Sequence, residues 1–135
     1  MIYVDSNYWI YWLDSRVPEH DSIADTVESA INEGVAMSYV TLSEVAHYLR
    51  MLPKEEFVKL MSSIRNLSAV TFFDLDSRIA DLSLKMLPEY APKGLGSRDC
   101  IILATMKLSG VKRIATHDRA FRQVPDIEVV DTIAR

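Results

Sequence analysis

The feature that most limits the fold of this chain is the alternation of short apolar runs with longer amphipathic segments. Apolar residues between the short runs recur at spacings of three and four, as they do on the buried face of a helix. This alternation predicts an α/β fold in which helices cover both faces of a mostly parallel sheet. The five predicted strands are Ile2 to Val4, Val35 to Val40, Ala69 to Phe73, Arg113 to Thr116 and Ile127 to Val130.

Helix breakers separate the amphipathic segments. Helices are expected to stop, or loops to turn, at the Gly and Pro residues between these segments. These residues are Gly34, Pro53, Pro88, Pro92, Gly94, Gly96 and Gly110.

The length and composition predict a single domain over residues 1–135. Hydrophobic residues make up 49% and charged residues 25%, which excludes a largely disordered chain. The longest apolar runs, such as residues 100–104, are far shorter than the ~20 residues that cross a bilayer. The first residues lack the pattern of a signal peptide and Cys100 is the only cysteine, so we expect a cytoplasmic protein with no membrane span.

The net charge of −4 argues against a broad basic surface for nucleic acid. The sum includes every carboxylate that a divalent cation would neutralise, however, and an acidic metal pocket is compatible with a basic rim. Net charge therefore leaves an RNA partner open.

Four acidic residues fall where strands end or helices begin. Asp5 follows the first predicted strand, Glu44 is expected to open the helix after the second, and Asp118 follows the fourth. Asp99 follows a Gly-rich loop and begins an apolar helix. Because parallel strands end at one edge of a sheet, where ligands bind in such folds, these carboxylates are predicted to share a pocket.

Each of these acids also has a purely structural interpretation. Carboxylates at helix N-termini are common, and Thr41 to Glu44 matches a capping box with Glu44 at the third helical position. Asp5 and Asp118 are candidate N-caps, and Asp99 is a first-turn acid after a Ser97 cap. Taken one at a time, capping is the favoured interpretation.

The four acids together favour a metal site. Two carboxylates ~4 Å apart repel by ~4 kcal/mol at an effective dielectric of ~20, so a cluster needs protons or cations. Oxygen ligands without a Cys and His set suit Mg²⁺ or Mn²⁺ rather than zinc. Such ions activate water and stabilise the charge of a phosphodiester transition state.

The chain resembles the PIN domains, especially the VapC-type toxins of VapBC toxin–antitoxin pairs. The resemblance covers nearly the whole chain, and the order and spacing of four short motifs carry it. These motifs are residues 4–7 (VDSN), 41–45 (TLSEV), 97–105 (SRDCIILAT) and 116–121 (THDRAF).

The resemblance implies a three-layer α/β/α sandwich and cleavage of RNA that depends on Mg²⁺ or Mn²⁺. It assigns Asp5, Glu44, Asp99 and Asp118 to the metal pocket as catalytic residues. It also implies a VapB-like antitoxin partner and a homodimer. The supporting or substrate-binding candidates are Ser6, Asn7, Thr116, Arg98 and Arg119, with solvated surface charge as the default interpretation of the two arginines.

Two other functions remain open from the sequence. One is a catalytically inactive module of the same fold that binds RNA or protein, with carboxylates that only cap helices. The other is a different metal-dependent phosphatase or nuclease of the α/β type. Asp74 and Asp76 resemble part of a two-aspartate phosphatase signature, but capping of a helix from Ser77 to Leu87 explains them better.

The first predicted helix departs from the family in being aromatic, with Trp9 and Trp12 three residues apart. Core packing is the favoured interpretation, and contact with an antitoxin or a second protomer is the alternative. We expect His117 to point away from Asp118 and Cys100 to be a core residue, and we expect no ligand role for His20 and His47. Further candidates for the RNA-facing rim are Arg122, Lys93, Lys112 and Arg113.

Overall fold

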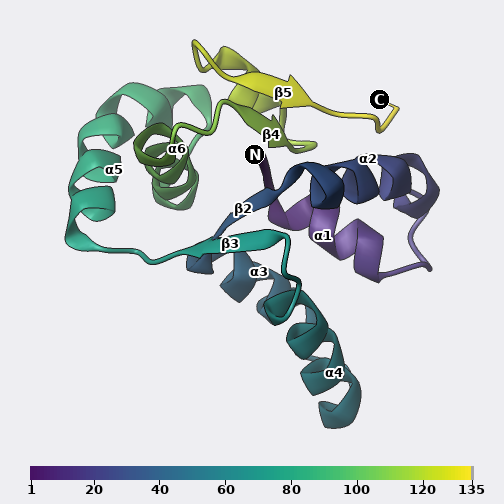
Figure 1. The fold of residues 1–135 in the computed structure, drawn as a ribbon. Coiled ribbons are helices and arrows are strands. Elements are labelled where there is room, and N and C mark those ends of the chain that lie inside the picture. Colours follow the sequence, from purple (N-terminus) through teal and green to yellow (C-terminus); the bar gives the residue numbers. More distant parts are fainter. Residues whose placement is uncertain (135) are drawn as a thin grey trace.

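A five-stranded parallel sheet forms the centre of the computed structural model, which describes residues 1–134. The strands lie in the order β3-β2-β1-β4-β5, and every neighbouring pair is parallel (Figure 1). The predicted α/β class and parallel sheet are confirmed. The strands are β1 (Ile2–Val4), β2 (Val35–Ser38), β3 (Val70–Phe73), β4 (Arg113–Ala115) and β5 (Glu128–Val130).

Four strands are shorter than predicted: β2 by two residues, and β3, β4 and β5 by one residue each. The sequence pattern carries β2 to Val40, but β2 ends at Ser38 and a helix begins at Tyr39. The Ser38 side chain accepts a hydrogen bond from Val40 N at 3.1 Å and so caps that helix. An apolar run therefore continues from a buried strand into a partly buried helix turn, and periodicity alone does not show where the strand ends.

Helices cover both faces of the sheet, as the sandwich prediction requires (Figure 1). Helix α4 extends away from the rest of the molecule. The helices of the described region are α1 (Ser6–Leu13), α2 (His20–Glu33), α3 (Tyr39–Leu49), α4 (Lys54–Arg65), α5 (Ser77–Tyr90) and α6 (Ser97–Ser109), with short 3₁₀ turns η1 (Ala91–Lys93) and η2 (Arg119–Gln123). Among residues 1–134, no helix combines the length and apolarity that crossing a membrane requires.

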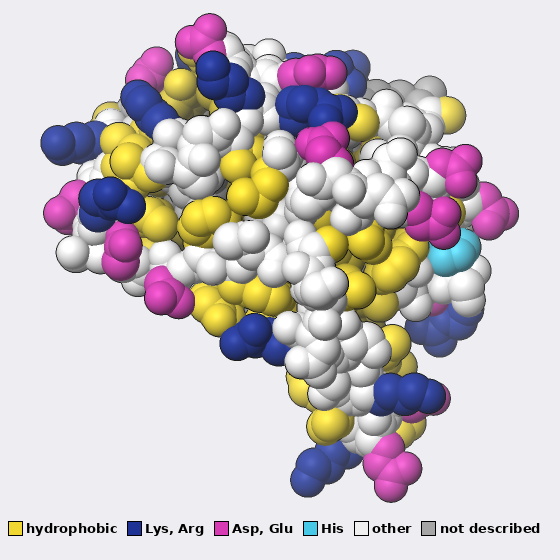
Figure 2. All heavy atoms as spheres, in the orientation of Figure 1, with side chains coloured by type: hydrophobic (Ala, Val, Ile, Leu, Met, Phe, Trp, Pro, Cys, Tyr) yellow, Lys and Arg dark blue, Asp and Glu magenta, His cyan; other side chains and the backbone are white. Residues whose placement is uncertain are grey.

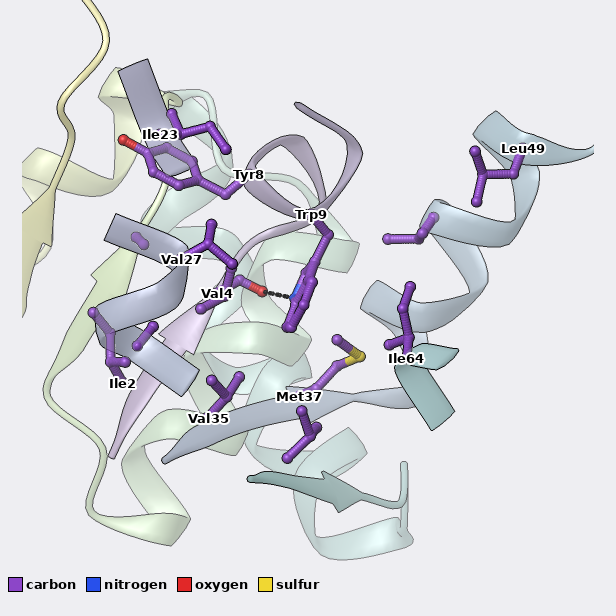
Figure 3. Close-up of a cluster of buried hydrophobic side chains, with 14 residues drawn as sticks. Ile2, Val4, Tyr8, Trp9, Ile23, Val27, Val35, Met37, Leu49 and Ile64 are labelled. Atoms are coloured by element: carbon purple, nitrogen blue, oxygen red, sulfur yellow. Dashed lines mark hydrogen bonds between the residues drawn. The ribbon is translucent and has the colours of Figure 1, made fainter. Parts of the chain in front are cut away.

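Two hydrophobic cores lie on opposite faces of the sheet. Successive side chains of β1 point into different cores. Ile2 and Val4 pack on the side of α1 and α2, whereas Tyr3 packs on the side of α6. Figure 3 shows the first core, where side chains from β1, β2, α1, α2, α3 and α4 meet. Burial on both faces explains why the central strands β1 and β2 are almost uninterruptedly apolar.

The aromatic residues of α1 belong mainly to this core. Tyr8 and Trp9 are fully buried, and Trp9 Nε1 donates a hydrogen bond to Val4 O at 3.1 Å (Figure 3). Trp12 is partly buried and meets the Trp9 ring edge-on at 5.8 Å between centroids. Core packing therefore accounts for the departure from the aliphatic pattern.

The breaker pattern predicts that the helix stops before Pro88. Helix α5 instead continues to Tyr90. Proline removes one backbone donor and clashes with the preceding turn, so it is tolerated poorly in the middle of a helix. Here it falls within the last turn, and Ala91 N still donates to Leu87 O. The cost is therefore confined to the end of the helix.

Candidate active site

The carboxyl edge of the sheet brings together the residues that the sequence singles out. Chain order reverses on either side of β1, which lies between β2 and β4, and ligands of open α/β sheets bind at such a point. Asp5 follows β1, and Thr116 follows β4 next to it. Helices α3 and α6 bring Glu44 and Asp99 toward the same edge.

Asp5 is held rigidly. Its side chain is 2% exposed, Oδ1 accepts from Ser6 N at 2.8 Å, and Oδ2 accepts from Thr116 Oγ1 at 2.7 Å. Asp5 is thus the N-cap of α1 and at the same time the link between β1 and β4. Thr116, one of the supporting candidates from the sequence, therefore contacts a carboxylate of the candidate site.

Glu44 lies in the middle of α3, not at its start. Because Ser38 is the N-cap, the predicted capping box at Thr41 to Glu44 is wrong. Glu44 Oε2 accepts from Ser6 Oγ at 3.4 Å and pairs with Arg98 Nη1 at 2.5 Å. Its other oxygen, Oε1, is buried and accepts no hydrogen bond from any residue between 1 and 134. Capping therefore does not explain this acid.

Asp99 and Arg98 complete the group from the first turn of α6. Asp99 Oδ2 accepts from Gly96 N at 3.2 Å, and Asp99 Oδ1 pairs with Arg98 Nη2 at 3.1 Å. The cap of α6 is Gly96, and Ser97 is its first helical residue, so the predicted Ser97 cap is wrong by one position. The Arg98 guanidinium bridges Glu44 and Asp99, and its side chain remains 49% exposed.

Burial raises the pKa of both Asp5 and Glu44. For Asp5 the hydrogen bonds from Thr116 and Ser6, and the positive charge of Arg98, act in the opposite direction. For Glu44 the charge of Arg98 lowers the pKa, whereas the negative charges of Asp5 and Asp99 raise it. These three carboxylates therefore act on one another electrostatically, and a cation stabilises their ionised forms.

Asp118 joins the site through Thr116 rather than through the other acids. Its backbone N donates to Thr116 Oγ1 at 3.1 Å, and its side chain caps η2 by accepting from Ala120 N at 2.9 Å. Asn7 Nδ2 also donates to Thr116 Oγ1, at 3.4 Å, and Asn7 Oδ1 accepts from His117 N at 3.3 Å. Arg119 begins η2 and is exposed.

The donor chemistry of this edge fits a hard divalent cation. All candidate ligands are carboxylate oxygens, and the buried, unpartnered Glu44 Oε1 is the kind of atom that a metal or its bound water would satisfy. In the arrangement seen, however, no three His, Cys, Asp or Glu side chains within residues 1–134 group to hold a metal. Arg98 instead supplies positive charge to Glu44 and Asp99, so metal binding requires that these side chains rearrange.

Sequence reasoning missed Tyr3 as a positioning residue. Its hydroxyl lies 2.6 Å from Thr41 Oγ1 and accepts from Ser38 N at 3.0 Å, which ties β1 to the first turn of α3. Burial raises the pKa of Tyr3 far above its usual value, so its hydroxyl stays protonated. A tyrosine inside a fully buried strand is the only indication in the sequence, since a buried hydroxyl needs partners.

A second missed group holds the segment before Asp118. Asp131 accepts from Tyr8 Oη at 2.8 Å and lies 2.9 Å from His117 Nδ1. His117 therefore points toward Asp131, in agreement with the prediction that it turns away from Asp118. Asp131 thereby joins the chain after β5 to α1.

The remaining sequence candidates have structural roles or lie elsewhere. Cys100 is buried, as predicted, and Asp76 caps α5 by accepting from Ile79 N at 2.9 Å. Arg113 begins β4, so it lies at the amino edge of the sheet, where it pairs with Glu33. A largely apolar cavity of about 250 Å³ near Lys112 also lies at that edge, away from the carboxylates. Lys112 and Arg113 are therefore not at the rim of the candidate site.

Comparison with known proteins agrees with this fold. The model of the PIN domain family matches residues 2–127. Because the match covers nearly the whole chain, this chain belongs to the PIN domain family. No sequence among the curated proteins matches it.

Solved structures share its fold at low sequence identity. VapC20 from Mycobacterium tuberculosis, described as a sarcin-ricin loop cleaving toxin, has a TM-score of 0.80 and 17% identity over 96% of this chain and 98% of that one. VapBC2 from Rickettsia felis, bound to a promoter DNA fragment, has a TM-score of 0.74 and 20% identity over 97% and 98%. FitAcB from Neisseria gonorrhoeae has a TM-score of 0.73 and 22% identity over 96% of each chain.

Proposed function

We propose that this protein is an endoribonuclease dependent on Mg²⁺ or Mn²⁺, and that it is the toxin of a toxin–antitoxin pair. The observation that carries the proposal is the group of Asp5, Glu44 and Asp99 around Arg98 at the point where strand order reverses. Asp118 is included as a fourth acid because it shares Thr116 with Asp5.

Each side chain has a role in this proposal. Asp5, Glu44, Asp99 and Asp118 hold the cation, directly or through its water molecules. A bound Mg²⁺ or Mn²⁺ lowers the pKa of a coordinated water and stabilises the charge that develops at phosphorus and on the departing oxygen. Arg98 is half exposed and, once released from Glu44, is placed to contact the phosphate.

Ser6, Asn7 and Thr116 orient the charged groups. Thr116 Oγ1 donates to Asp5 and accepts from Asn7 Nδ2 and Asp118 N, so one hydroxyl links the ends of β1 and β4. Ser6 Oγ donates to Glu44 Oε2 and thereby connects α1 to α3. These contacts keep Asp5 in place before substrate arrives, so the rearrangement that metal binding needs is confined to Arg98 and the acids paired with it.

The proposed partners are an antitoxin of the VapB kind and a second copy of this chain. A further solved structure of similar fold, with a TM-score of 0.65 and 22% identity, is described as a toxin–antitoxin complex from Klebsiella pneumoniae. Exposed apolar side chains at the end of α3 and on α4 suit a protein partner, with Met51 82% and Val58 51% exposed. A gene for a small DNA-binding protein directly upstream would support this part.

The Arg98 ion pairs favour one rival, an inactive module of the same fold. In that case Arg98 neutralises Glu44 and Asp99 permanently, and no metal enters. Purified protein should be incubated with a structured RNA in Mg²⁺, in Mn²⁺, in EDTA, and as folded Asp99→Asn. Cleavage that EDTA and Asp99→Asn both abolish is expected. Absence of cleavage on several RNAs, with antitoxin removed, would favour the inactive module.

A further inference from the structure

An open groove of about 660 Å³ leads away from the candidate active site along α3. Glu44 and Arg98, which belong to that site, line one end. His47, Tyr48 and Arg50 line the groove further along α3, and the first turns of α1 form its other side. The groove is therefore continuous with the place where the proposed chemistry occurs.

The groove has the length of a short stretch of nucleic acid. At ~1.5 Å of rise per residue, Arg50 lies about 9 Å beyond Glu44 along the helix axis. Stacked nucleotides advance by ~3.4 Å each, so this length accommodates roughly three of them. The groove thus reaches beyond a single scissile phosphate.

The charge of the lining is opposite to the charge of the whole chain. Among residues 1–134, Glu44 is the only acidic residue that lines the groove, and that side chain is already paired with Arg98. Arg50 and His47 add potential positive charge, whereas the whole chain carries −4. On the face seen in Figure 2, basic and acidic side chains are interspersed rather than gathered into a basic patch. A local basic groove resolves the conflict between the net charge and an RNA partner.

Two side chains of the groove are fixed in ways that suit RNA. Arg50 Nη1 donates to His47 O at 2.6 Å, and a guanidinium has four further N–H donors for phosphate oxygens. Tyr48 is 45% exposed, and its hydroxyl donates to Asp14 Oδ2 at 3.2 Å, which holds the ring in place. An exposed ring in a groove that Arg50 and Arg98 also line is a platform on which an unpaired base stacks.

We infer that this groove binds the single-stranded RNA next to the scissile phosphate. Arg98 contacts the phosphate at the site, Arg50 and His47 contact phosphates further along, and a base stacks on Tyr48. The inference rests on the proposed function and deepens it. It gives roles to His47 and Tyr48, for which neither the motifs nor the carboxylate geometry provides one.

The test measures binding without cleavage. A fluorescent single-stranded oligoribonucleotide is titrated in EDTA at several salt concentrations, with fluorescence anisotropy as the readout. Arg50→Ala should raise Kd about fivefold or more and reduce the salt slope by about 1. Tyr48→Leu should raise Kd about fivefold or more, whereas Tyr48→Phe keeps the ring and should remain within about twofold of the wild type.

Arg78→Ala is the matched control, because Arg78 is an exposed arginine on α5, on the other face of the sheet. It should leave Kd within about twofold of the wild type. All variants are at exposed positions, and circular dichroism melting confirms that they fold.

Equal RNA affinity of wild type, Arg50→Ala and Tyr48→Leu would overturn the inference, as would an absence of RNA binding by the wild type. Unchanged RNA binding with weakened binding of a partner protein would identify the groove as a protein site, which also overturns it. Cleavage in Mn²⁺ is measured separately. If the wild type cleaves RNA while the variants bind it normally, the proposed function stands and only the assignment of this groove to RNA binding is wrong.

Discussion

Arg98 is the residue on which the two interpretations of this site differ. It lies 2.5 Å from Glu44 and 3.1 Å from Asp99, so it provides the positive charge that neighbouring carboxylates require. If the site binds a cation, Arg98 competes with it and then becomes available to substrate. If the site is inactive, the ion pairs are its final state. The two interpretations therefore differ in whether removing Arg98 changes the affinity of the site for a metal ion.

Arg98→Met should therefore tighten Mn²⁺ binding. A half-exposed ion pair contributes ~1 kcal/mol, so its removal should lower the Mn²⁺ Kd by about fivefold, as measured by calorimetry. The metal-free variant should melt at a lower temperature, because Glu44 and Asp99 lose their counterion. Cleavage should slow despite the tighter binding, since the phosphate contact is lost.

Arg113→Met is the control for that experiment. Arg113 pairs with Glu33 and Glu128 at the opposite edge of the sheet and is 39% exposed. Its loss should leave the Mn²⁺ Kd unchanged. A metal affinity that responds equally to both substitutions, or to neither, would contradict the role given to Arg98.

At the scale of elements, the sequence placed a site residue correctly where the start of its helix could be predicted correctly. Asp5 follows β1 and caps α1 as the pattern predicts, because a strand followed at once by a polar cap has a clear signature. Glu44 was placed at the wrong helix position, since the apolar residues Tyr39 and Val40 continue the strand pattern. Tyr3 was missed because its partners, Ser38 and Thr41, become neighbours only through the pairing of β1 with β2.

Asp14 gives a prediction at this scale, because it joins the end of α1 to α3. It accepts hydrogen bonds from Arg16 Nε at 2.8 Å and from Tyr48, and the Arg16 bond lowers its pKa to about 2. A lowered carboxylate pKa stabilises the folded state above the unfolded value of ~3.9, and this stability is lost as pH falls toward 2.

Asp14→Asn should lower the free energy of unfolding by about 1 kcal/mol at pH 7, because the exposed Arg16 is screened by solvent. The difference from the wild type should shrink between pH 4 and pH 2. Urea titrations across this range measure it, with Asp21→Asn, an acid in the first turn of α2, as the control. A difference that is constant with pH would show that the charge of Asp14 is not its cause.

For the whole molecule, the order of strands and helices could be predicted from the sequence. The ion pairs of the candidate site and the groove beside it could not. Alternating apolar periodicity is a property of local sequence, so the parallel sheet and its two helical layers could be predicted from it. The motifs located Asp5, Glu44, Asp99 and Asp118 at one edge. The bridging position of Arg98 and the basic groove along α3 depend on how α3 and α6 pack, which no local pattern encodes.

The four acids are not equally informative about function. Asp5, Asp99 and Asp118 all accept hydrogen bonds from backbone N–H groups at helix starts, so their loss would affect folding as well as chemistry. Glu44 lies inside α3 and does not cap it, and one of its oxygens is buried with no hydrogen-bond partner in the described part of the chain, residues 1–134. A functional role for the cluster is therefore tested most cleanly at Glu44.

The decisive measurement is the rate at which folded Glu44→Gln cleaves RNA in Mn²⁺, beside wild type and the control Glu55→Gln in the first turn of α4. The metal-site account predicts a loss of about 100-fold or more for Glu44→Gln and none for Glu55→Gln, because a neutral amide cannot replace the charge. Cleavage by Glu44→Gln at the wild-type rate would contradict it.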